Sequence, residues 1–518
     1  MNGAQALIRT LVDCRVDVCF TNPGTSEMHF VAALDSVPEM RASLGLFEGV
    51  VTGAADGYGR MAERPAATLL HLGPGLGNGL ANLHNARRAR TPVVNIVGDH
   101  ALPHKQHDAP LESDIESVAS NVSGWIRTSQ SAAAVAGDAA ESVAAAMGPP
   151  GQVATLILPA DVSWTDGAEP AAPRPAPARG VVSAEVVDRV AKALVSGEPS
   201  VLLVGGGAMR ARGLEAASRV ANTTGAKLLG ETFPARLERG AGLPPIERLG
   251  YLAEFTVAQL EGARHLVLVD TKAPVSFFAY PEKPSYLVPD GCEVHVLASD
   301  ADDAVTALEG LADVVGASAE AVTRQPTDRP DRPTGDLNGE TVAAALGALL
   351  PEGAIVSDEA NTQGLWASPA TAGAPPHDWL TLTGGAIGQG LPVATGAAVA
   401  CPDRKVVSLE ADGSAMYTFQ SLWTQAREGL DVTTVVFNNR SYAILNLELS
   451  RVGADSSGPK AREMLDLSRP DLDFVLLAQG MGVPAARANT AEEFVSALDR
   501  AMAAEGPQLV EAVLPARM

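Results

Sequence analysis

A carboxylate and an amide occupy a sequence setting that suits a hard metal ion. Asp412 follows a β-branched run at 405–409, and Asn439 follows a second run at 433–437, with a helical pattern between them. A right-handed strand–helix–strand crossover would place both side chains at the carboxyl ends of neighbouring parallel strands, where open α/β sheets bind ligands. Their oxygens suit Mg²⁺, which completes its octahedron with phosphates and water. Either residue alone would favour a simple turn, but together they predict a metal site.

Glu48 is the second candidate for chemistry. It stands where an apolar strand meets a predicted helix, and its apolar neighbours should exclude water from it. Desolvation raises the pKa of a carboxyl group toward the range useful in acid–base catalysis. These neighbours are Leu46, Phe47, Val50 and Val51. The alternative is an ordinary acidic residue at a helix N-terminus, stabilised by the helix dipole.

Two glycine-rich runs predict loops in which the backbone can approach a ligand closely. One extends from Thr383 to Gly390, and the other, from His71 to Gly79, follows a predicted strand and opens a helix. The second run lacks the spacing of a dinucleotide-binding fingerprint. His71 is a candidate for proton transfer, although a lone histidine after a strand is usually structural.

The run Ala411-Asp412-Gly413-Ser414, followed by Asn438-Asn439, resembles the thiamine diphosphate signature of the pyruvate decarboxylase and acetolactate synthase superfamily. That family usually has Gly at the position of Ala411, where a methyl group is tolerable if φ is negative. The resemblance implies that the side chains of Asp412 and Asn439 and the backbone carbonyl of Ser441 bind Mg²⁺. The resemblance to the family extends over essentially the whole chain in domain order. It is strong in the first and third segments of the chain and weaker in the middle one.

The same resemblance assigns residues to the thiamine diphosphate cofactor. It implies that Glu48 activates the cofactor by bonding to N1′ of its aminopyrimidine, and that Gly385 accepts a hydrogen bond from this ring. Ile387 would bend the cofactor into its V shape, although a core role is the alternative. The other cofactor-binding positions that the resemblance implies are Asn78, Asn361, Thr362, Gly413 and Ser414.

Five positions are candidates for contact with the substrate. Thr25 lies in a loop where it could hydrogen-bond the substrate or cap a turn. Leu111 stands near the place where acetolactate synthases carry a Phe-Gln pair, and Leu445 stands where pyruvate decarboxylases carry a glutamate. Glu448, one helical turn later, could also face the pocket, and Gln389 completes the set.

The resemblance implies an apolar pocket short of protonating groups, because Phe278-Ala279 and Leu445 stand where simple decarboxylases of the family carry a histidine and a glutamate. A carbanion formed by loss of CO₂ would then attack an aldehyde or ketone. We therefore expect a decarboxylase and carboligase that acts on a 2-keto acid or 2-hydroxyketone with an aldehyde acceptor, similar to acetolactate synthase. The alternatives are a benzoylformate-type decarboxylase, a 2-hydroxyacyl lyase and a weakly catalytic cofactor-binding subunit. The flavin-binding run of acetolactate synthases is not found, so flavin is not expected, and a flavin-dependent oxidase is a further alternative.

Alternating β-branched runs and Ala-rich helical patterns predict an α/β protein with three doubly wound parallel-sheet domains. Two segments rich in Pro, Ala and charge divide the chain. We expect a pyrimidine-binding domain at 1–165, a central Rossmann-like domain at 183–315 and a diphosphate-binding domain at 337–518. The linkers would be 166–182 and 316–336.

Composition excludes several classes of partner. Thirty-eight Lys and Arg against 61 Asp and Glu give a net charge of −23 at pH 7, which would repel nucleic acid. No apolar stretch approaches the ~20 residues of a membrane-spanning helix, and no signal peptide is evident, so we expect a cytoplasmic protein. The family resemblance implies a homodimer or homotetramer in which Glu48 of one chain meets the metal site of another.

Overall fold

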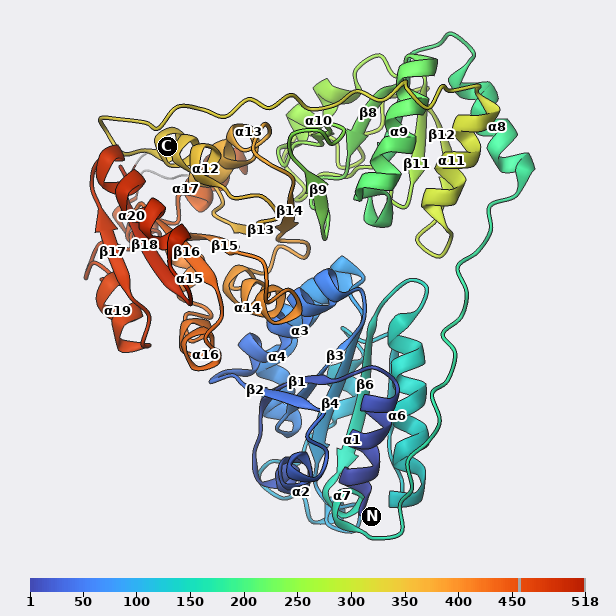
Figure 1. Ribbon diagram of the computed structural model, residues 1–518, viewed down its shortest axis with the longest axis vertical. Helices are drawn as coiled ribbons and strands as arrows, with labels where there is room; N and C mark the ends of the chain where they lie inside the picture. The colour runs from blue at the N-terminus through green and yellow to red at the C-terminus, as the bar shows by residue number, and fades with distance from the viewer. Residues whose placement is uncertain (455–457, 517–518) are drawn as a thin grey trace.

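The computed structural model describes residues 1–454 and 458–516 and confirms three α/β domains, each with a mainly parallel sheet. In Figure 1 the N-terminal domain, blue to teal, lies below the green central domain and the orange to red C-terminal domain. Segments near 166–182 and 316–336 run between domains over the outside of the molecule. Among the described residues, no helix combines the length and apolar character that crossing a bilayer requires.

The N-terminal domain has a six-stranded parallel sheet in the order β2-β1-β3-β4-β6-β5. Its strands are β1 Val18–Asn22, β2 Arg41–Leu44, β3 Ala66–Leu70, β4 Val93–Asp99, β5 Trp125–Thr128 and β6 Val153–Pro159. Its helices are α1 Gly3–Asp13, α2 Met28–Ala33, α3 Glu48–Ala62, α4 Leu72–Ala89, α5 Ile115–Ala119, α6 Ala132–Met147 and α7 Ala160–Trp164, with the 3₁₀ turn η1 at Thr25–Glu27.

The central domain has a five-stranded sheet in the order β10-β8-β7-β11-β12, so β12 is an edge strand. Its strands are β7 Ser200–Val204, β8 Lys227–Gly230, β10 Glu247–Arg248, β11 His265–Val269 and β12 Glu293–Ala298. Its helices are α8 Ala184–Leu194, α9 Ala211–Thr224, α10 Ala253–Leu260 and α11 Ala304–Val314.

The C-terminal domain has a seven-stranded sheet in the order β17-β18-β16-β15-β13-β14-β9. Its strands are β13 Ile355–Glu359, β14 His377–Thr381, β15 Val406–Ala411, β16 Val432–Asn438, β17 Ala485–Ala488, β18 Gln508–Val513 and the short β9 Leu237–Arg239. Its helices are α12 Gly339–Leu349, α13 Ala367–Ala370, α14 Gly390–Ala400, α15 Asp412–Ala415, α16 Ser421–Glu428, α17 Ala443–Arg451, α18 Pro459–Glu463, α19 Phe474–Gly480 and α20 Ala491–Ala503.

Strand β9 comes from the segment that otherwise forms the central domain. It pairs with β14 and is antiparallel to it, whereas the other strand pairs of this sheet are parallel. The two domains are therefore joined by backbone hydrogen bonds as well as by the linker.

Helices α3 and α14 bring the N- and C-terminal domains into direct contact (Figure 1). A Cβ at Gly57 would lie 2.1 Å from the backbone oxygen of Val393, and one at Gly396 would lie 1.8 Å from that of Ala54. Glycine is required at both positions because the two backbones approach so closely. The apolar core is continuous across this contact, since buried residues of both helices belong to one cluster.

Candidate active site

Asp412 and Asn439 follow the carboxyl ends of the adjacent parallel strands β15 and β16. Ala411, the last residue of β15, pairs in register with Phe437 of β16, so the residues after these two strands lie at the same edge of the sheet. Both strands are rich in valine and buried on both faces, as expected within a parallel sheet. Ala411 has φ of −72°, so its methyl group causes no backbone strain.

The Asp412 carboxylate is buried and receives hydrogen bonds from backbone groups. The backbone N–H of Gly413 donates to Oδ1 at 2.7 Å and that of Arg440 donates to Oδ2 at 2.6 Å. Burial raises the pKa of Asp412 to about 6, against the opposing effect of these hydrogen bonds. The Asn439 Oδ1 accepts a hydrogen bond from the N–H of Ser441 at 3.0 Å. A cation at this edge would offset the cost of burying the Asp412 charge.

The loop after β13 reaches the same edge. The Asn361 amide donates to the Ser414 hydroxyl at 3.0 Å, and Thr362 beside it is buried. Asn361 and Arg440 have φ of 50° and 57°, a conformation that is uncommon for residues other than glycine and that clusters at functional sites. A Cβ at Gly413 would lie 2.4 Å from the Tyr442 ring, so a larger residue there would displace this ring.

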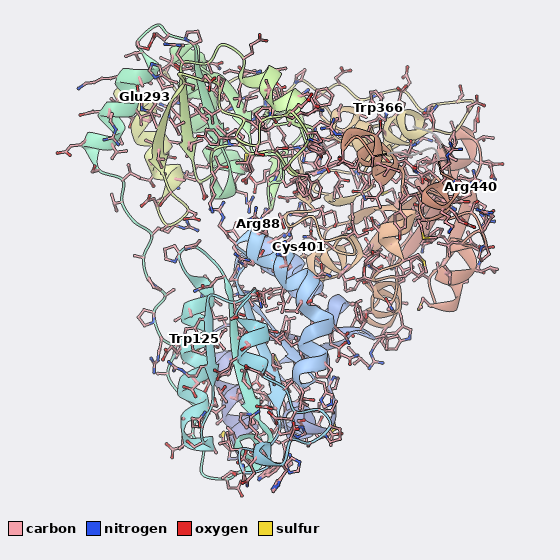
Figure 2. The ribbon with its side chains drawn as sticks, turned by 180° about the vertical axis from the view of Figure 1, so that it is seen from behind. Arg88, Trp125, Glu293, Trp366, Cys401 and Arg440 are labelled. Carbon is pink, nitrogen blue, oxygen red and sulfur yellow. The ribbon has the colours of Figure 1, made fainter. Side chains whose placement is uncertain are left out.

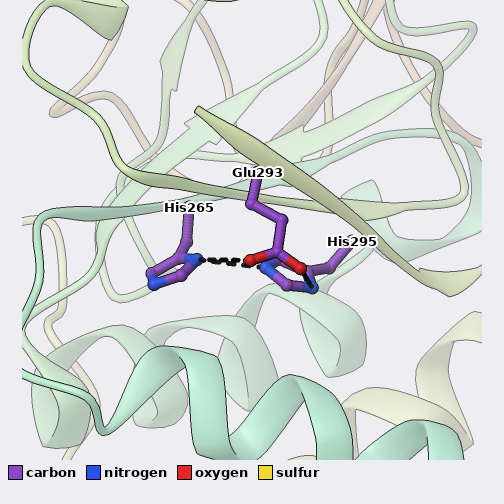
Figure 3. A group of neighbouring side chains, drawn as sticks. All are labelled: His265, Glu293 and His295. Atoms are coloured by element: carbon purple, nitrogen blue, oxygen red, sulfur yellow. Dashed lines mark hydrogen bonds and ion pairs between the residues drawn. The ribbon is translucent and has the colours of Figure 1, made fainter. Parts of the chain in front are cut away.

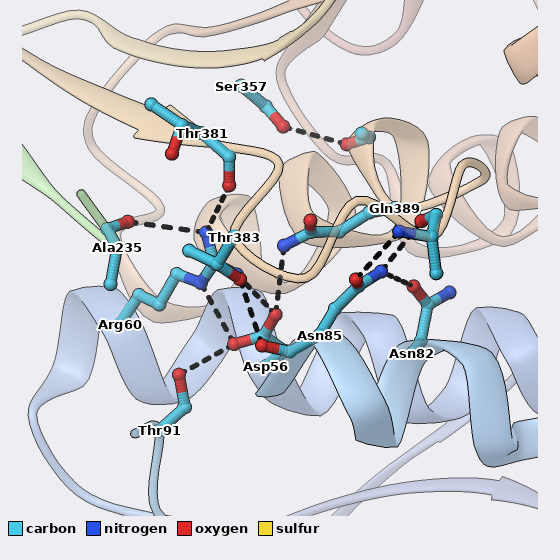
Figure 4. Close-up of polar contacts among 12 residues, drawn as sticks. Asp56, Arg60, Asn82, Asn85, Thr91, Ala235, Ser357, Thr381, Thr383 and Gln389 are labelled. Atoms are coloured by element: carbon cyan, nitrogen blue, oxygen red, sulfur yellow. Dashed lines mark hydrogen bonds and ion pairs between the residues drawn. The ribbon is translucent and has the colours of Figure 1, made fainter. Parts of the chain in front are cut away.

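The glycine-rich run 383–390 is held against α4 of the N-terminal domain (Figure 4). The Asn82 amide donates to the Gly388 carbonyl at 3.0 Å, and the Asn85 amide donates to the Ala386 carbonyl at 2.8 Å. Gly385 has φ of 73° and Ile387 is half-buried. The run predicted to hold the aminopyrimidine is therefore positioned by side chains of another domain.

Gln389 belongs to a buried polar network rather than to an open pocket (Figure 4). Its amide donates to Asp56 at 3.1 Å, and Asp56 forms an ion pair with Arg60 at 2.6 Å. Arg60 in turn donates to the carbonyl of Thr381 at 2.8 Å. The contacts of Gln389 thus join the N- and C-terminal domains. Sequence reasoning did not identify Asp56 and Arg60, because a carboxylate and a guanidinium spaced i, i+4 are equally typical of a solvent-exposed helix face.

Glu48 is the first residue of α3 and is buried. The Asn78 amide of α4 donates to Glu48 Oε2 at 3.0 Å, so two residues from separate predicted motifs meet here. Among the described residues, Glu48 Oε1 receives no hydrogen bond from the chain. Of the predicted apolar neighbours, Val50 and Val51 are buried, whereas Leu46 is 46% exposed.

His71 is held by a buried glutamate that sequence reasoning did not identify as functional. Its Nδ1 lies 2.8 Å from Glu27 Oε2, which also accepts a hydrogen bond from the N–H of Gly24 at 2.7 Å. Burial raises the pKa of Glu27, and the histidine and the backbone oppose this effect. Glu27 ends the loop that contains Thr25, and this position next to a predicted substrate residue was the sequence signal that could have identified it. The carboxylate orients the ring through Nδ1.

The remaining predicted substrate residues differ in exposure and in their contacts. Thr25 is exposed at the start of η1, Leu111 is 40% exposed in a turn, and Leu445 on α17 is 45% exposed. Glu448 on the same helix accepts hydrogen bonds from two central-domain hydroxyls. These come from Tyr280 at 2.7 Å and Tyr251 at 3.2 Å.

The candidate site consists of two halves. Among the described residues, the side-chain hydrogen bonds of Glu48 stay within the N-terminal domain, and those of Asp412 stay within the C-terminal domain. Exposed apolar side chains lie beside each half: Leu46 next to Glu48, and Leu365, Trp366, Met416 and Tyr417 shortly after the C-terminal loops.

Two protein-family models match this chain. The N-terminal TPP binding domain of thiamine pyrophosphate enzymes matches residues 1–118, and the C-terminal TPP binding domain of the same enzymes matches residues 361–512. The first match contains Glu48, His71 and Asn78, and the second contains Asn361, Asp412 and Asn439.

Similar proteins align over nearly the whole chain. A Mycobacterium tuberculosis protein named "Putative acetolactate synthase large subunit IlvX" is 62% identical over 99% of each chain. Benzoylformate decarboxylase of Pseudomonas aeruginosa is 30% identical over 95% of each chain. The solved structure of a thiamine diphosphate-dependent 4-hydroxybenzoylformate decarboxylase from Rhodococcus jostii RHA1 has a TM-score of 0.85 and 24% identity over 99% of each chain, so the folds are alike.

Proposed function

The chain belongs to the thiamine pyrophosphate enzyme family, and we propose that it is a thiamine diphosphate- and Mg²⁺-dependent enzyme acting on 2-keto acids. It would break the bond between the carboxyl and keto carbons of a donor acid and join the remaining unit to an aldehyde acceptor. The observation that carries the proposal is the buried Glu48 carboxylate, oriented by Asn78 with Oε1 left for a ligand.

The residues present fit the cofactor. When bound, thiamine diphosphate supplies the carbon nucleophile and electron sink that the chemistry needs. Glu48 would hold a proton at the aminopyrimidine, Gly385 would accept a hydrogen bond through its carbonyl, and Ile387 would support the bent shape. Gly385 has a positive φ, a conformation that glycine adopts readily and that is compatible with a tight loop whose backbone approaches a ligand closely.

A hard divalent cation also fits the C-terminal half-site. Asp412, Asn439 and the carbonyl of Ser441 offer oxygen ligands of the kind that Mg²⁺ takes, and phosphates would complete its shell. Burial raises the pKa of Asp412 to about 6 although backbone hydrogen bonds oppose this effect, and a divalent ion would provide a positive charge beside the carboxylate. Asn361, Thr362, Gly413 and Ser414 would line the diphosphate.

A second candidate function is decarboxylation with release of the aldehyde, as the name of the Pseudomonas aeruginosa relative indicates for that protein. This reaction needs an acid that protonates the carbon left by CO₂. The pairing of His71 with Glu27 at 2.8 Å supports this role, because Glu27 holds the proton on Nδ1, and Nε2 could take up a second proton and pass it to that carbon.

The test is CO₂ release from a panel of 2-keto acids with thiamine diphosphate and Mg²⁺, each with and without an added aldehyde. Release accompanied by a joined product supports the carboligase, and release with free aldehyde as the end product supports the decarboxylase. If no acid of the panel loses CO₂, although the protein binds the cofactor, the proposed 2-keto acid chemistry is wrong.

The two half-sites support a shared active site in a homodimer or homotetramer, in which Glu48 of one chain serves the metal half-site of another. Mixing two inactive variants, Glu48→Gln and Asn439→Ala, after dissociation and reassociation tests this arrangement. A mixed dimer has one site with both residues intact, so activity should return. If all mixtures stay inactive while mass analysis shows mixed dimers, Glu48 and Asn439 serve the same chain.

A further inference from the structure

Three side chains that could bind a metal, with a fourth side chain, a carboxylate, beside them, meet at the amino ends of three adjacent strands of the central domain. His265 is the first residue of β11 and pairs in register with Ser200 of β7 and Glu293 of β12. His295 lies two residues after Glu293, and Glu198 precedes β7. Neighbouring partners in a parallel sheet, and residues two apart on one strand, share a face. His265, Glu293 and His295 therefore project to one side, and Figure 3 shows them converging.

The distances suit one small cation. His265 Nδ1 lies 3.1 Å from His295 Nε2, and Glu293 Oε2 lies 4.0 Å from His265 Nδ1. Two nitrogens bound to a tetrahedral Zn²⁺ at ~2.0–2.1 Å stand ~3.3–3.4 Å apart. The histidines already have nearly this separation, and the ligand atoms of the two histidines and the exposed Glu293 all lie within 4.8 Å of one another.

Glu198 fixes which nitrogen of His265 is available. Its carboxylate lies 3.0 Å from His265 Nε2 and can only accept a hydrogen bond, so that nitrogen carries the proton. Nδ1 is then left with its lone pair toward His295. A carboxylate that holds the far nitrogen of a metal-binding histidine is a recurrent feature of zinc sites, where it orients the ring and increases its basicity.

The charges around the cluster also favour a cation. Glu293 Oε1 lies 3.9 Å from His295 Nδ1, and Glu198 lies 3.0 Å from His265 Nε2, so a carboxylate stands beside each imidazole. Both imidazoles are largely buried, with exposed fractions of 9% for His265 and 8% for His295.

We propose that His265, His295 and Glu293 bind Zn²⁺ or a similar divalent transition metal, that water fills the remaining position, and that Glu198 orients His265. Imidazole ligands select such metals over Mg²⁺, which prefers oxygen. The site is distinct from the active site, because Glu293 and Arg440 lie on opposite sides of the molecule in Figure 2. Its effect would be structural, since it would fasten the edge strand β12 to β11.

The test is a titration of the full chain with Zn²⁺, followed by metal analysis after dialysis and competition with a chromophoric chelator. Excess Mg²⁺ and thiamine diphosphate are present to occupy the other half-sites. The wild type should retain one Zn²⁺ per chain and unfold at a higher temperature with Zn²⁺ than without it. His295→Gln and Glu293→Gln should lose the bound metal and this thermal shift. Glu198→Gln should weaken binding by ~10–100-fold.

The matched control is the double variant His104→Gln, His107→Gln, because these exposed residues belong to a second group of neighbouring histidines, with ring centroids 5.6 Å apart. It should bind Zn²⁺ as the wild type does. Glu293 is exposed, so its replacement leaves the fold intact even if the histidine variants unfold. Zn²⁺ retained at wild-type affinity by Glu293→Gln and His295→Gln, or lost from the control variant, would overturn the proposal, and this outcome is independent of 2-keto acid activity.

Discussion

Glu48 is the residue whose change should separate binding from turnover. Glu48→Gln keeps the size of the side chain and an oxygen for the Asn78 amide, but it removes the carboxylate that would hold a proton at the cofactor. We expect thiamine diphosphate to bind nearly as in the wild type while turnover falls by ~10²–10⁴-fold or more. Isothermal titration with the cofactor and a CO₂-release assay check the two effects. Wild-type turnover in the variant would remove Glu48 from the mechanism.

Glu27 should act through His71 as a positioning residue. His71→Ala should lower kcat by ~10²–10⁴-fold if the ring transfers a proton. Glu27→Gln can still accept the Nδ1 hydrogen bond but loses its charge, so its effect on kcat should be smaller, with KM little changed.

The double variant of Glu27 and His71 distinguishes positioning from a general loss of structure. If Glu27 acts only through the ring, the double variant is no slower than His71→Ala alone. Steady-state kinetics on all four proteins provide the comparison. Effects that multiply in the double variant would show that Glu27 acts independently of His71.

His377 gives stability a dependence on pH. Its Nδ1 donates to the Pro375 carbonyl at 2.8 Å, and burial, together with the nearby Arg239, lowers its pKa to about 4. The unfolded chain has the ordinary pKa of about 6.5 and takes up the proton first, so this group destabilises the fold as pH falls from about 6.5 toward 4. Between pH 7 and pH 5 the expected loss is about 2 kcal/mol.

The test compares urea unfolding of the wild type and His377→Asn at these two pH values. Asparagine keeps a donor for Pro375 and does not titrate, so the variant should lose less stability on acidification. Equal losses in both proteins would mean that His377 does not titrate in this interval.

Sequence patterns located the individual loops but not the partners that hold them. Asp412 and Asn439 could be placed together because the crossover rule relates the ends of adjacent parallel strands. The Glu27 contact with His71 depends on where a short 3₁₀ turn directs its side chain, and no periodicity encodes that direction. Gln389 shows that a residue within a predicted loop can have an unexpected partner. The sequence predicts that it contacts the substrate, whereas its amide donates to the buried Asp56.

At the scale of elements, the close contact of α3 and α14 sets the relation between two domains. Gly57→Ala would place a methyl group 2.1 Å from the Val393 carbonyl oxygen, a backbone atom that cannot move without shifting α14. We expect destabilisation of ~1–3 kcal/mol, as for overpacked cores. Thermal unfolding measures this effect.

Gly310 in α11 is the matched control for Gly57. It also lies inside a helix, but nothing stands within 4 Å of a Cβ built there. Gly310→Ala should leave stability unchanged or raise it by up to about 1 kcal/mol through higher helix propensity. A Gly57→Ala protein as stable as the Gly310→Ala protein would show that the two helices can separate freely.

Most elements were predictable because β-branched runs alternate with Ala-rich helical patterns. Strand β9 was not, since it has three residues and belongs to the sheet of a domain that begins about a hundred positions later. Such a pairing is decided by tertiary packing, because a strand this short carries little propensity of its own.

At the scale of the molecule, the exposed apolar side chains beside both half-sites agree with cover by a second chain. Leu46 accompanies Glu48, and Leu365 and Trp366 follow the Asn361 loop. Grouped apolar exposure of this kind marks interaction surfaces, whereas single exposed residues need no explanation. A shared site would make activity depend on association. The pairing of Glu48 with the metal site of another chain is implied by the family resemblance, because no residue pattern within one chain encodes it.

Leu365→Glu tests this dependence, because the side chain is 67% exposed and a charge there costs the isolated chain little but would be buried in an interface. The variant should dissociate at concentrations where the wild type is associated, and its specific activity should fall with dilution and recover at high protein concentration. Analytical ultracentrifugation and assays over the same concentration range measure the two properties. Val181→Glu, on a linker residue that is 89% exposed, is the control and should change neither. A Leu365→Glu protein with the mass and activity of the wild type at every concentration would place the subunit interface elsewhere on the molecule.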